Sequence, residues 1–261
     1  MSDNPRLSWR CALVVCACAF LFASAAAAPS RAADEEPVDG ALYLILLKKN
    51  VWGKQVDYVG LKVYEGELDN YLLLMGATEP DLLSRRDRLA YYINMYNAWT
   101  LKLVLMHYPG IKSIKDIGWF LKGPWDQEVV RMTSGVLTLA QLESDILVKQ
   151  FKDPRVLFAI NCACKSCPQL VDEPYEGHSV DTQLDKVATA FVNDKDCNRL
   201  EGNVLYLSEL FKLHEAEFPN GVLAFVIKYA KGDLLRRLVA GKDTIRIEYL
   251  PFDWSLNALD Q

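Results

Sequence analysis

An apolar run that ends in three closely spaced cysteines most constrains how this chain can fold. Residues 156–160 read Val-Leu-Phe-Ala-Ile, and Cys162, Cys164 and Cys167 follow within a few positions. The length and apolar continuity of this run predict a buried strand over 156–160. Three thiols would then lie at the end of that strand. In an oxidising compartment, such thiols are usually paired, bound to metal or used in chemistry.

The first residues of the chain have the layout of a secretory signal peptide. Arg6 and Arg10 provide positive charge, and residues 11–28 form an apolar and small-residue run that ends in four alanines. This pattern predicts a signal peptide over 1–28, cleavage near 28–33, and export to a periplasmic or extracellular location. Retention as an N-terminal membrane anchor, or lipidation at a lipobox-like stretch over 15–18, are the alternatives.

The charge balance limits the kinds of partner. The net charge is −5 and the pI is near 5.3, whereas nucleic acids and anionic membranes are bound by basic surfaces. We therefore expect no nucleic-acid partner and no membrane contact apart from the leader. The partner would be a small molecule or a protein. No cofactor is expected.

The remaining sequence predicts one domain over 40–261, preceded by a polar linker over 29–39. Helical periodicity and capping patterns dominate, strands are short, and there is no regular alternation of strand and helix. We therefore expect an α+β fold, mainly helical, with a small and mostly antiparallel sheet. The predicted helices cover 41–49, 60–75, 84–108, 139–151, 184–191, 208–218, 223–231 and 234–239, and the other strands cover 127–132, 136–137, 204–207 and 244–249.

The cysteine cluster has several possible roles. Loss of the leader would leave Cys162, Cys164, Cys167 and Cys197, which allow three fully paired connectivities. A structural disulfide could join Cys162 to Cys167 or one of the cluster to Cys197. Zinc prefers paired and well-spaced ligands, so no metal is expected. A thioredoxin-like fold is disfavoured because only a short helix fits before Pro174.

A nucleophilic cysteine is the remaining role for the cluster, and it usually needs a base within hydrogen-bonding reach. The chain contains His107, His178 and His214. Each is more typical of a surface or packing histidine than of a catalytic one. His178 is the preferred candidate because it follows Cys167 closely in loop-rich sequence.

Other polar residues occur where burial is expected. Asn94 and Asn97 lie in the most apolar predicted helix, beside Tyr96. Buried amides need hydrogen-bond partners, so the asparagines either hold neighbouring loops or line a binding pocket together with Tyr96. Glu143, near the start of a predicted helix, either interacts with the helix dipole or orients a catalytic base. Arg155 is expected to pair with nearby carboxylates and is a further candidate binding residue.

Several short motifs resemble the bacterial and plant family that carries the domain of unknown function numbered 547. The resemblance covers roughly 56–218, the core of the predicted domain, with an echo over 253–257. The matching pieces are Val56-Asp-Tyr58, Ile93-Asn-Met-Tyr-Asn-Ala98, Ser113-Ile-Lys-Asp-Ile117, Leu139-Ala-Gln-Leu-Glu143, Asp153-Pro-Arg155, Phe158-Ala159, Cys162-Ala163, Cys167-Pro-Gln-Leu170, Leu207-Ser208 and Phe211.

The resemblance implies that Cys162 and Cys167 correspond to the two cysteines of the family, and it assigns no activity. Cys164 stands where the family usually has serine. Ser144 and Leu157 stand where it often has histidine. Two hypotheses follow. In one, the protein is a thiol-dependent enzyme for acyl transfer, hydrolysis or thiol–disulfide exchange, with Cys162, Cys167 and Glu143 as catalytic candidates. In the other, it is an exported binding or structural protein that a disulfide stabilises.

Overall fold

The computed structural model describes residues 37–119 and 122–259, which fall within one compact unit spanning Asp34–Gln261. The predicted signal peptide and most of the predicted linker lie outside the described residues. Within them, no helix has the length and hydropathy needed to cross a membrane.

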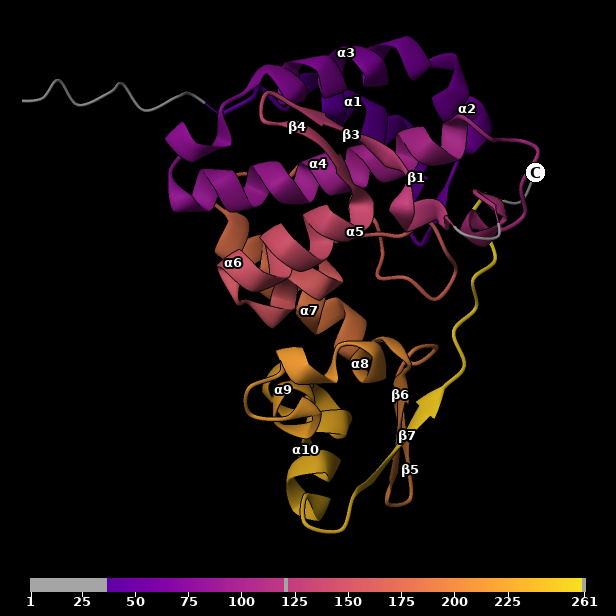
Figure 1. The fold of residues 1–261 in the computed structure, drawn as a ribbon. Coiled ribbons are helices and arrows are strands. Elements are labelled where there is room, and N and C mark those ends of the chain that lie inside the picture. Colours follow the sequence, from indigo (N-terminus) through magenta and orange to yellow (C-terminus); the bar gives the residue numbers. More distant parts are fainter. Residues whose placement is uncertain (1–36, 120–121, 260–261) are drawn as a thin grey trace, which may run out of the picture. The chain divides into compact units, whose positions relative to one another are not determined.

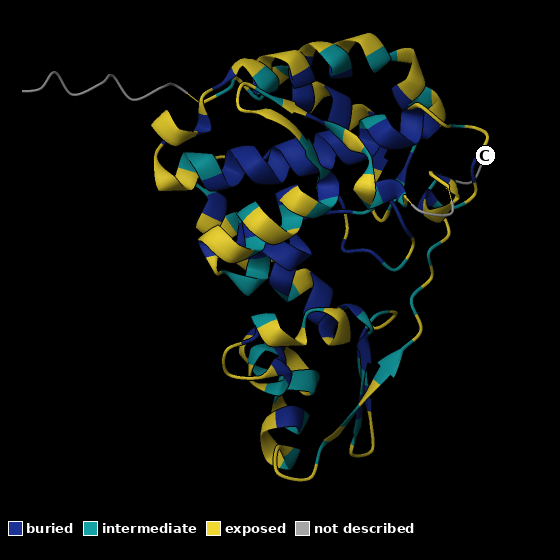
Figure 2. Cartoon of the chain, viewed as in Figure 1, coloured by how far each residue is buried: buried dark blue, intermediate teal, exposed yellow. Residues whose placement is uncertain are grey.

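A long buried helix, α4 (Arg85–Leu105), forms the centre of the first half of the domain. Its start is specified by Ser84, whose hydroxyl accepts a hydrogen bond from the backbone N–H of Asp87 (3.2 Å). Most of its residues from Leu89 onward are buried, and Figure 2 shows dark blue along the helix beyond its first turn. A helix that is apolar on nearly all sides has to be covered by other elements.

Helix α3 (Glu65–Ala77) and strand β3 (Glu128–Met132) of a β-hairpin pack against α4, and α1 (Ala41–Asn50) packs against α3 (Figure 1). The hairpin pairs β3 with β4 (Gly135–Thr138) in antiparallel register, close to the strands predicted over 127–132 and 136–137. A short antiparallel pair joins β1 to β2. The elements of this part are α1 (Ala41–Asn50), β1 (Val51–Trp52), β2 (Gln55–Val56), α2 (Tyr58–Val63), α3 (Glu65–Ala77), η1 (Pro80–Leu82), η2 (Ile114–Asp116), η3 (Pro124–Asp126), β3 (Glu128–Met132) and β4 (Gly135–Thr138).

The second half contains further helices and a three-stranded sheet. Its order is β5-β6-β7, with β5–β6 antiparallel and β6–β7 parallel. The elements are α5 (Leu139–Gln141), the π-helical η4 (Leu142–Val148), α6 (Lys149–Phe151), η5 (Pro154–Phe158), α7 (Val180–Val192), β5 (Arg199–Glu201), β6 (Val204–Ser208), α8 (Leu210–Leu213), η6 (Glu215–Glu217), α9 (Val222–Tyr229), α10 (Gly232–Gly241) and β7 (Arg246–Leu250). The mainly helical α+β prediction is confirmed.

The predicted strand over 156–160 is wrong. Asp153 caps the 3-10 helix η5 by accepting a hydrogen bond from the N–H of Arg155 (3.0 Å), and Pro154 occupies its first position. The run is apolar because it enters the core, where the Phe158 ring lies 5.1–5.5 Å from the rings of Phe191, Phe211 and Phe225. Continuous burial gives the same sequence pattern in a strand and in a helical turn.

The C-terminal segment 253–259 crosses back to the cysteine-containing loop. The N–H of Lys165 donates to the carbonyl of Ser255 (2.9 Å), and the N–H of Asn257 donates to the carbonyl of Ala163 (3.2 Å). Farther along, the N–H of Leu259 donates to the carbonyl of Val56 (2.8 Å). These bonds give the motif echo over 253–257 a structural role. It connects the loop to the first part of the domain.

Candidate functional site

A cavity of about 310 Å³ brings together residues from well-separated parts of the chain. We call it the Cys162 pocket. Its apolar walls are formed by Trp125, Ala140, Leu157, Ile160, Pro168, Leu210, Leu213, Phe252 and Trp254, and its polar lining residues are Tyr96, Glu143, Ser144, Cys162 and His214. A mainly apolar cavity with a few convergent polar groups is the usual form of a small-ligand site.

Glu143 and Tyr96 form a hydrogen-bonded pair in this pocket. Tyr96 lies on the buried helix α4, and its hydroxyl donates a hydrogen bond to Glu143 Oε2 (3.1 Å). Burial raises the pKa of Glu143, and the hydrogen bond from Tyr96 opposes this rise in part. Burial and the neighbouring Glu143 carboxylate raise the pKa of Tyr96 well above its ordinary value. The carboxyl group is therefore easier to protonate than one in water.

His214 provides a second titratable group beside Glu143. Its Nε2 lies 3.7 Å from Glu143 Oε1, which is too long for a hydrogen bond. Burial lowers the pKa of His214, so a neutral imidazole is favoured and the contact is not a strong ion pair. A neutral imidazole can accept a proton from a ligand or a thiol.

Three cysteine sulfur atoms converge at the edge of the pocket. The Sγ atoms of Cys162, Cys164 and Cys167 all lie within 4.8 Å of one another. Cys167 Sγ is in bonding contact with both other sulfurs, and the Cα–Cα distances are 6.1 Å to Cys162 and 5.1 Å to Cys164. Both fall within the range of about 4.4–6.8 Å that disulfides span. Since a disulfide joins two sulfurs, Cys167 can pair with one partner at a time.

The three cysteines differ in their surroundings. Cys164 and Cys167 are buried, at 2% and 6% exposure, whereas Cys162 is partly exposed and lines the pocket. Cys167 borders another cavity of about 180 Å³. Cys197 lies apart, with its Sγ 3.5 Å from Asp194 Oδ2. Burial, together with the charge of Asp194, raises the pKa of the Cys197 thiol to about 12, so it has little thiolate character.

Buried asparagine side chains hold the cysteine loop in place. Asn97 donates to the carbonyl of Ala159 (2.9 Å) and accepts from the N–H of Asn161 (2.8 Å). Asn161 in turn donates to the carbonyl of Pro168 (2.6 Å) and accepts from the N–H of Ala163 (2.9 Å). Asn161 therefore links the two ends of the cysteine loop, and Asn97 attaches the loop to α4.

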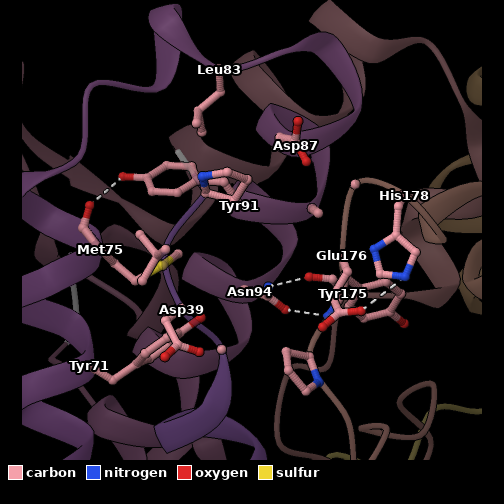
Figure 3. A pocket seen from close by; sticks show the side chains of 16 residues that line it. Asp39, Tyr71, Met75, Leu83, Asp87, Tyr91, Asn94, Tyr175, Glu176 and His178 are labelled. Atoms are coloured by element: carbon pink, nitrogen blue, oxygen red, sulfur yellow. Dashed lines mark hydrogen bonds and ion pairs between the residues drawn. The ribbon is translucent and has the colours of Figure 1, made fainter. Parts of the chain in front are cut away.

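Asn94 fixes a different loop. Its amide exchanges two hydrogen bonds with the backbone of Tyr175, at 2.8 and 2.9 Å. Figure 3 shows this pair in a cavity of about 250 Å³, where Asp87 and His178 are also drawn. His178, the histidine that the sequence favours as a base, borders this cavity, whereas His214 borders the Cys162 pocket.

Arg155 lies in an ion-pair network rather than in the Cys162 pocket. Its guanidinium contacts Asp153 (2.6 Å), Asp185 (2.9 Å) and Asp181 (3.1 Å). These bonds join η5 to α7, as expected from pairing with nearby carboxylates.

Of the residues expected to form a site, Cys162, Glu143 and Tyr96 line one pocket, with Cys167 in the adjoining cluster. Asn97 holds the cysteine loop through its hydrogen bond with the N–H of Asn161. Asn94 binds the loop that contains Tyr175, and Arg155 pairs with Asp185 on α7. Sequence reasoning missed the aromatic wall of Trp125, Phe252 and Trp254, because no local pattern links these residues. Ser144 and Leu157, where the family resemblance implies histidine, both line this pocket.

Comparison with known families supports the resemblance. Residues 80–192 match the family described as protein of unknown function, DUF547. The match runs from η1 to the end of α7 and includes Glu143 and the cysteine cluster. No curated protein and no solved structure matches the chain.

Proposed function

We propose that this chain is an exported protein that carries out thiol–disulfide exchange on a small, largely apolar ligand in the Cys162 pocket. The observation that carries the proposal is the position of Cys167, which is within disulfide reach of both Cys162 and Cys164. Cys162 also faces the pocket. A disulfide can therefore move between a pocket-facing pair and a buried pair.

Exchange would begin from the Cys162–Cys167 disulfide. A ligand thiolate attacks Cys162 Sγ, a ligand–Cys162 disulfide forms, and Cys167 leaves as a thiolate. A second thiol of the ligand then attacks the ligand sulfur and releases the Cys162 thiolate. The ligand dithiol loses two electrons and the protein disulfide gains them. An external disulfide would reoxidise the protein.

The polar groups of the pocket suit this chemistry. An incoming thiol has to lose its proton, and the neutral imidazole of His214 is a suitable acceptor. The Glu143 carboxyl lies 3.7 Å from that imidazole and would stabilise the imidazolium when ionised. The aromatic walls would hold the apolar part of the ligand.

A single-turnover experiment tests the proposal. Oxidised protein is mixed with one equivalent of dithiothreitol, quenched in acid, alkylated and mapped by peptide mass. The first adduct should appear on Cys162, and Cys162→Ser should abolish it. Cys197→Ser, which changes a cysteine outside the cluster, should react at the wild-type rate. Unchanged reaction of Cys162→Ser would refute the proposal. A disulfide that does not react with dithiothreitol would favour a structural role.

Acyl transfer or hydrolysis is the second candidate function. It is favoured because Cys162, His214 and Glu143 line the same pocket, the residue types of a cysteine nucleophile with a base and an orienting carboxylate. An activated ester should then leave an acyl group on Cys162 of the reduced protein, visible as a mass increase. Absence of the adduct would leave exchange as the preferred function.

Export has its own test. The apolar leader supports cleavage near 28–33 and a periplasmic or extracellular location. Mass determination of the N-terminus in an exported fraction should give a chain that starts in this range. A full-length chain found only with membranes would support the anchored alternative.

A further inference from the structure

The cysteine loop is held in shape by bonds that do not involve its sulfurs. The side chain of Asn161 connects the two ends of the loop, through Pro168 (2.6 Å) and Ala163 (2.9 Å). The N–H groups of Lys165 and Ser166 donate to the C-terminal segment at 2.9 and 3.2 Å. Reduction of the cluster would therefore leave three thiols close together, because the backbone that carries them is fixed independently.

A backbone donor lies against the cluster. The N–H of Cys164 donates to Cys167 Sγ over 3.2 Å. Cys164 and Cys167 are buried, whereas Cys162 lines the pocket and can be reached from it. Within residues 37–119 and 122–259, the group of potential ligands converging here consists of thiols alone.

We propose that the reduced cluster binds one copper(I) ion through Cys162, Cys164 and Cys167. Soft thiolate ligands favour copper(I), whereas a structural zinc site normally has four ligands. A metal ion bound to three sulfurs at about 2.3 Å in a plane requires sulfur–sulfur separations of about 4.0 Å. The Cys162–Cys164 separation is already 3.8 Å. Once the bond to Cys167 is reduced, that sulfur only has to move away from its neighbours to reach a similar distance.

This inference does not depend on the proposed exchange reaction. It differs from the sequence-based expectation that no metal binds, which rested on the ligand spacing that zinc prefers. Cys197 is not part of the group of converging ligands. Metal binding and disulfide formation would exclude each other, because both use the same sulfur electron pairs.

The test is an anaerobic titration of the fully reduced protein with copper(I) against a coloured copper(I) chelator. One ion should bind per chain. Cys162→Ser, Cys164→Ser and Cys167→Ser should each weaken binding by more than about 100-fold, the upper end of what loss of an outer-shell partner costs. Cys197→Ser should bind as the wild type does. X-ray absorption of the loaded protein should show three sulfur neighbours.

If a serine variant does not fold, a measurement on the wild-type protein still tests the proposal. Copper(I) should protect Cys162, Cys164 and Cys167 from alkylation and leave the labelling of Cys197 unchanged. Two sulfur neighbours, unaltered binding by Cys162→Ser, or tighter retention of zinc than of copper(I) would overturn the proposal. None of these results depends on whether the oxidised protein exchanges disulfides with dithiothreitol, so the two proposals fail separately.

Discussion

Replacing Asn97 with alanine should uncouple the cysteine loop from α4. The substitution removes the acceptor for the N–H of Asn161 and the donor to the carbonyl of Ala159, both at buried positions. A buried polar group left without a partner costs about 1–3 kcal/mol, so the two together should lower the free energy of unfolding by about 2–6 kcal/mol. That is a large fraction of the roughly 5–15 kcal/mol typical of a domain.

Asn94 is a matched control for this prediction. Its amide makes two buried hydrogen bonds of nearly the same lengths, to Tyr175 in another loop. Asn94→Ala should therefore cost a similar free energy, measured as a lower urea midpoint at constant slope. Only Asn97→Ala should also speed alkylation of the reduced cluster cysteines.

Either of two results would refute this reasoning. One is a loss below about 1 kcal/mol for Asn97→Ala, which would mean that the orphaned groups find water or relax. The other is an equal increase in cysteine alkylation in both variants, which would mean that the increase follows from general destabilisation. If Asn97→Ala does not fold, Asn97→Ser keeps a hydroxyl at the site and should show the same differential effect at smaller size.

Three further predictions concern stability. Gly177→Ala should lower the melting temperature measured by circular dichroism, because the added Cβ would lie 2.7 Å from the backbone nitrogen of Asp87 at the start of α4; an unchanged value would contradict the tight contact. Burial raises the pKa of Glu143, so its ionisation destabilises the fold as pH rises above the ordinary value of 4.5. The free energy of unfolding of Glu143→Gln, measured by urea denaturation, should therefore rise relative to that of the wild type as pH increases through that range. A difference that does not depend on pH would disprove the raised pKa of Glu143. Phe158→Ala should cost about 3–5 kcal/mol in the same assay, since its ring is almost fully buried; a cost below about 1 kcal/mol would contradict its place in the core.

Local signals were sufficient to predict much of the fold. Ser84 and Thr138 each cap a helix by accepting a hydrogen bond from the backbone N–H three residues later, at the starts of the helices predicted over 84–108 and 139–151. The hairpin of β3 and β4 is also local, because only a short turn separates its two strands. The run over 156–160 was misassigned because burial on all sides hides any periodicity, although Asp153 and Pro154 carry a helix-start signal.

The site required information that no local pattern contains. Tyr96, Glu143, Cys162 and His214 come from four separate segments, and only the packing of the helices brings them to one cavity. The parallel pairing of β6 with β7 is similarly non-local. The cysteines were recognised as a cluster from their spacing alone. Their ability to share Cys167 depends on the path of the loop, which Asn97 and Asn161 determine.

The return of the C-terminal segment to the cysteine loop has a consequence for the order of assembly. The partners of the Lys165 and Ser166 N–H groups lie at Ser255 and Asp253, so the loop cannot be completed until almost the whole chain has emerged. Earlier, its thiols would be open to chance pairing with other cysteines. A chain ended after Leu250 should therefore form more mixed disulfides on non-reducing gels than the full chain. Packing of residues 253–255 would thus be the step that completes the cysteine loop and limits chance pairing of its thiols.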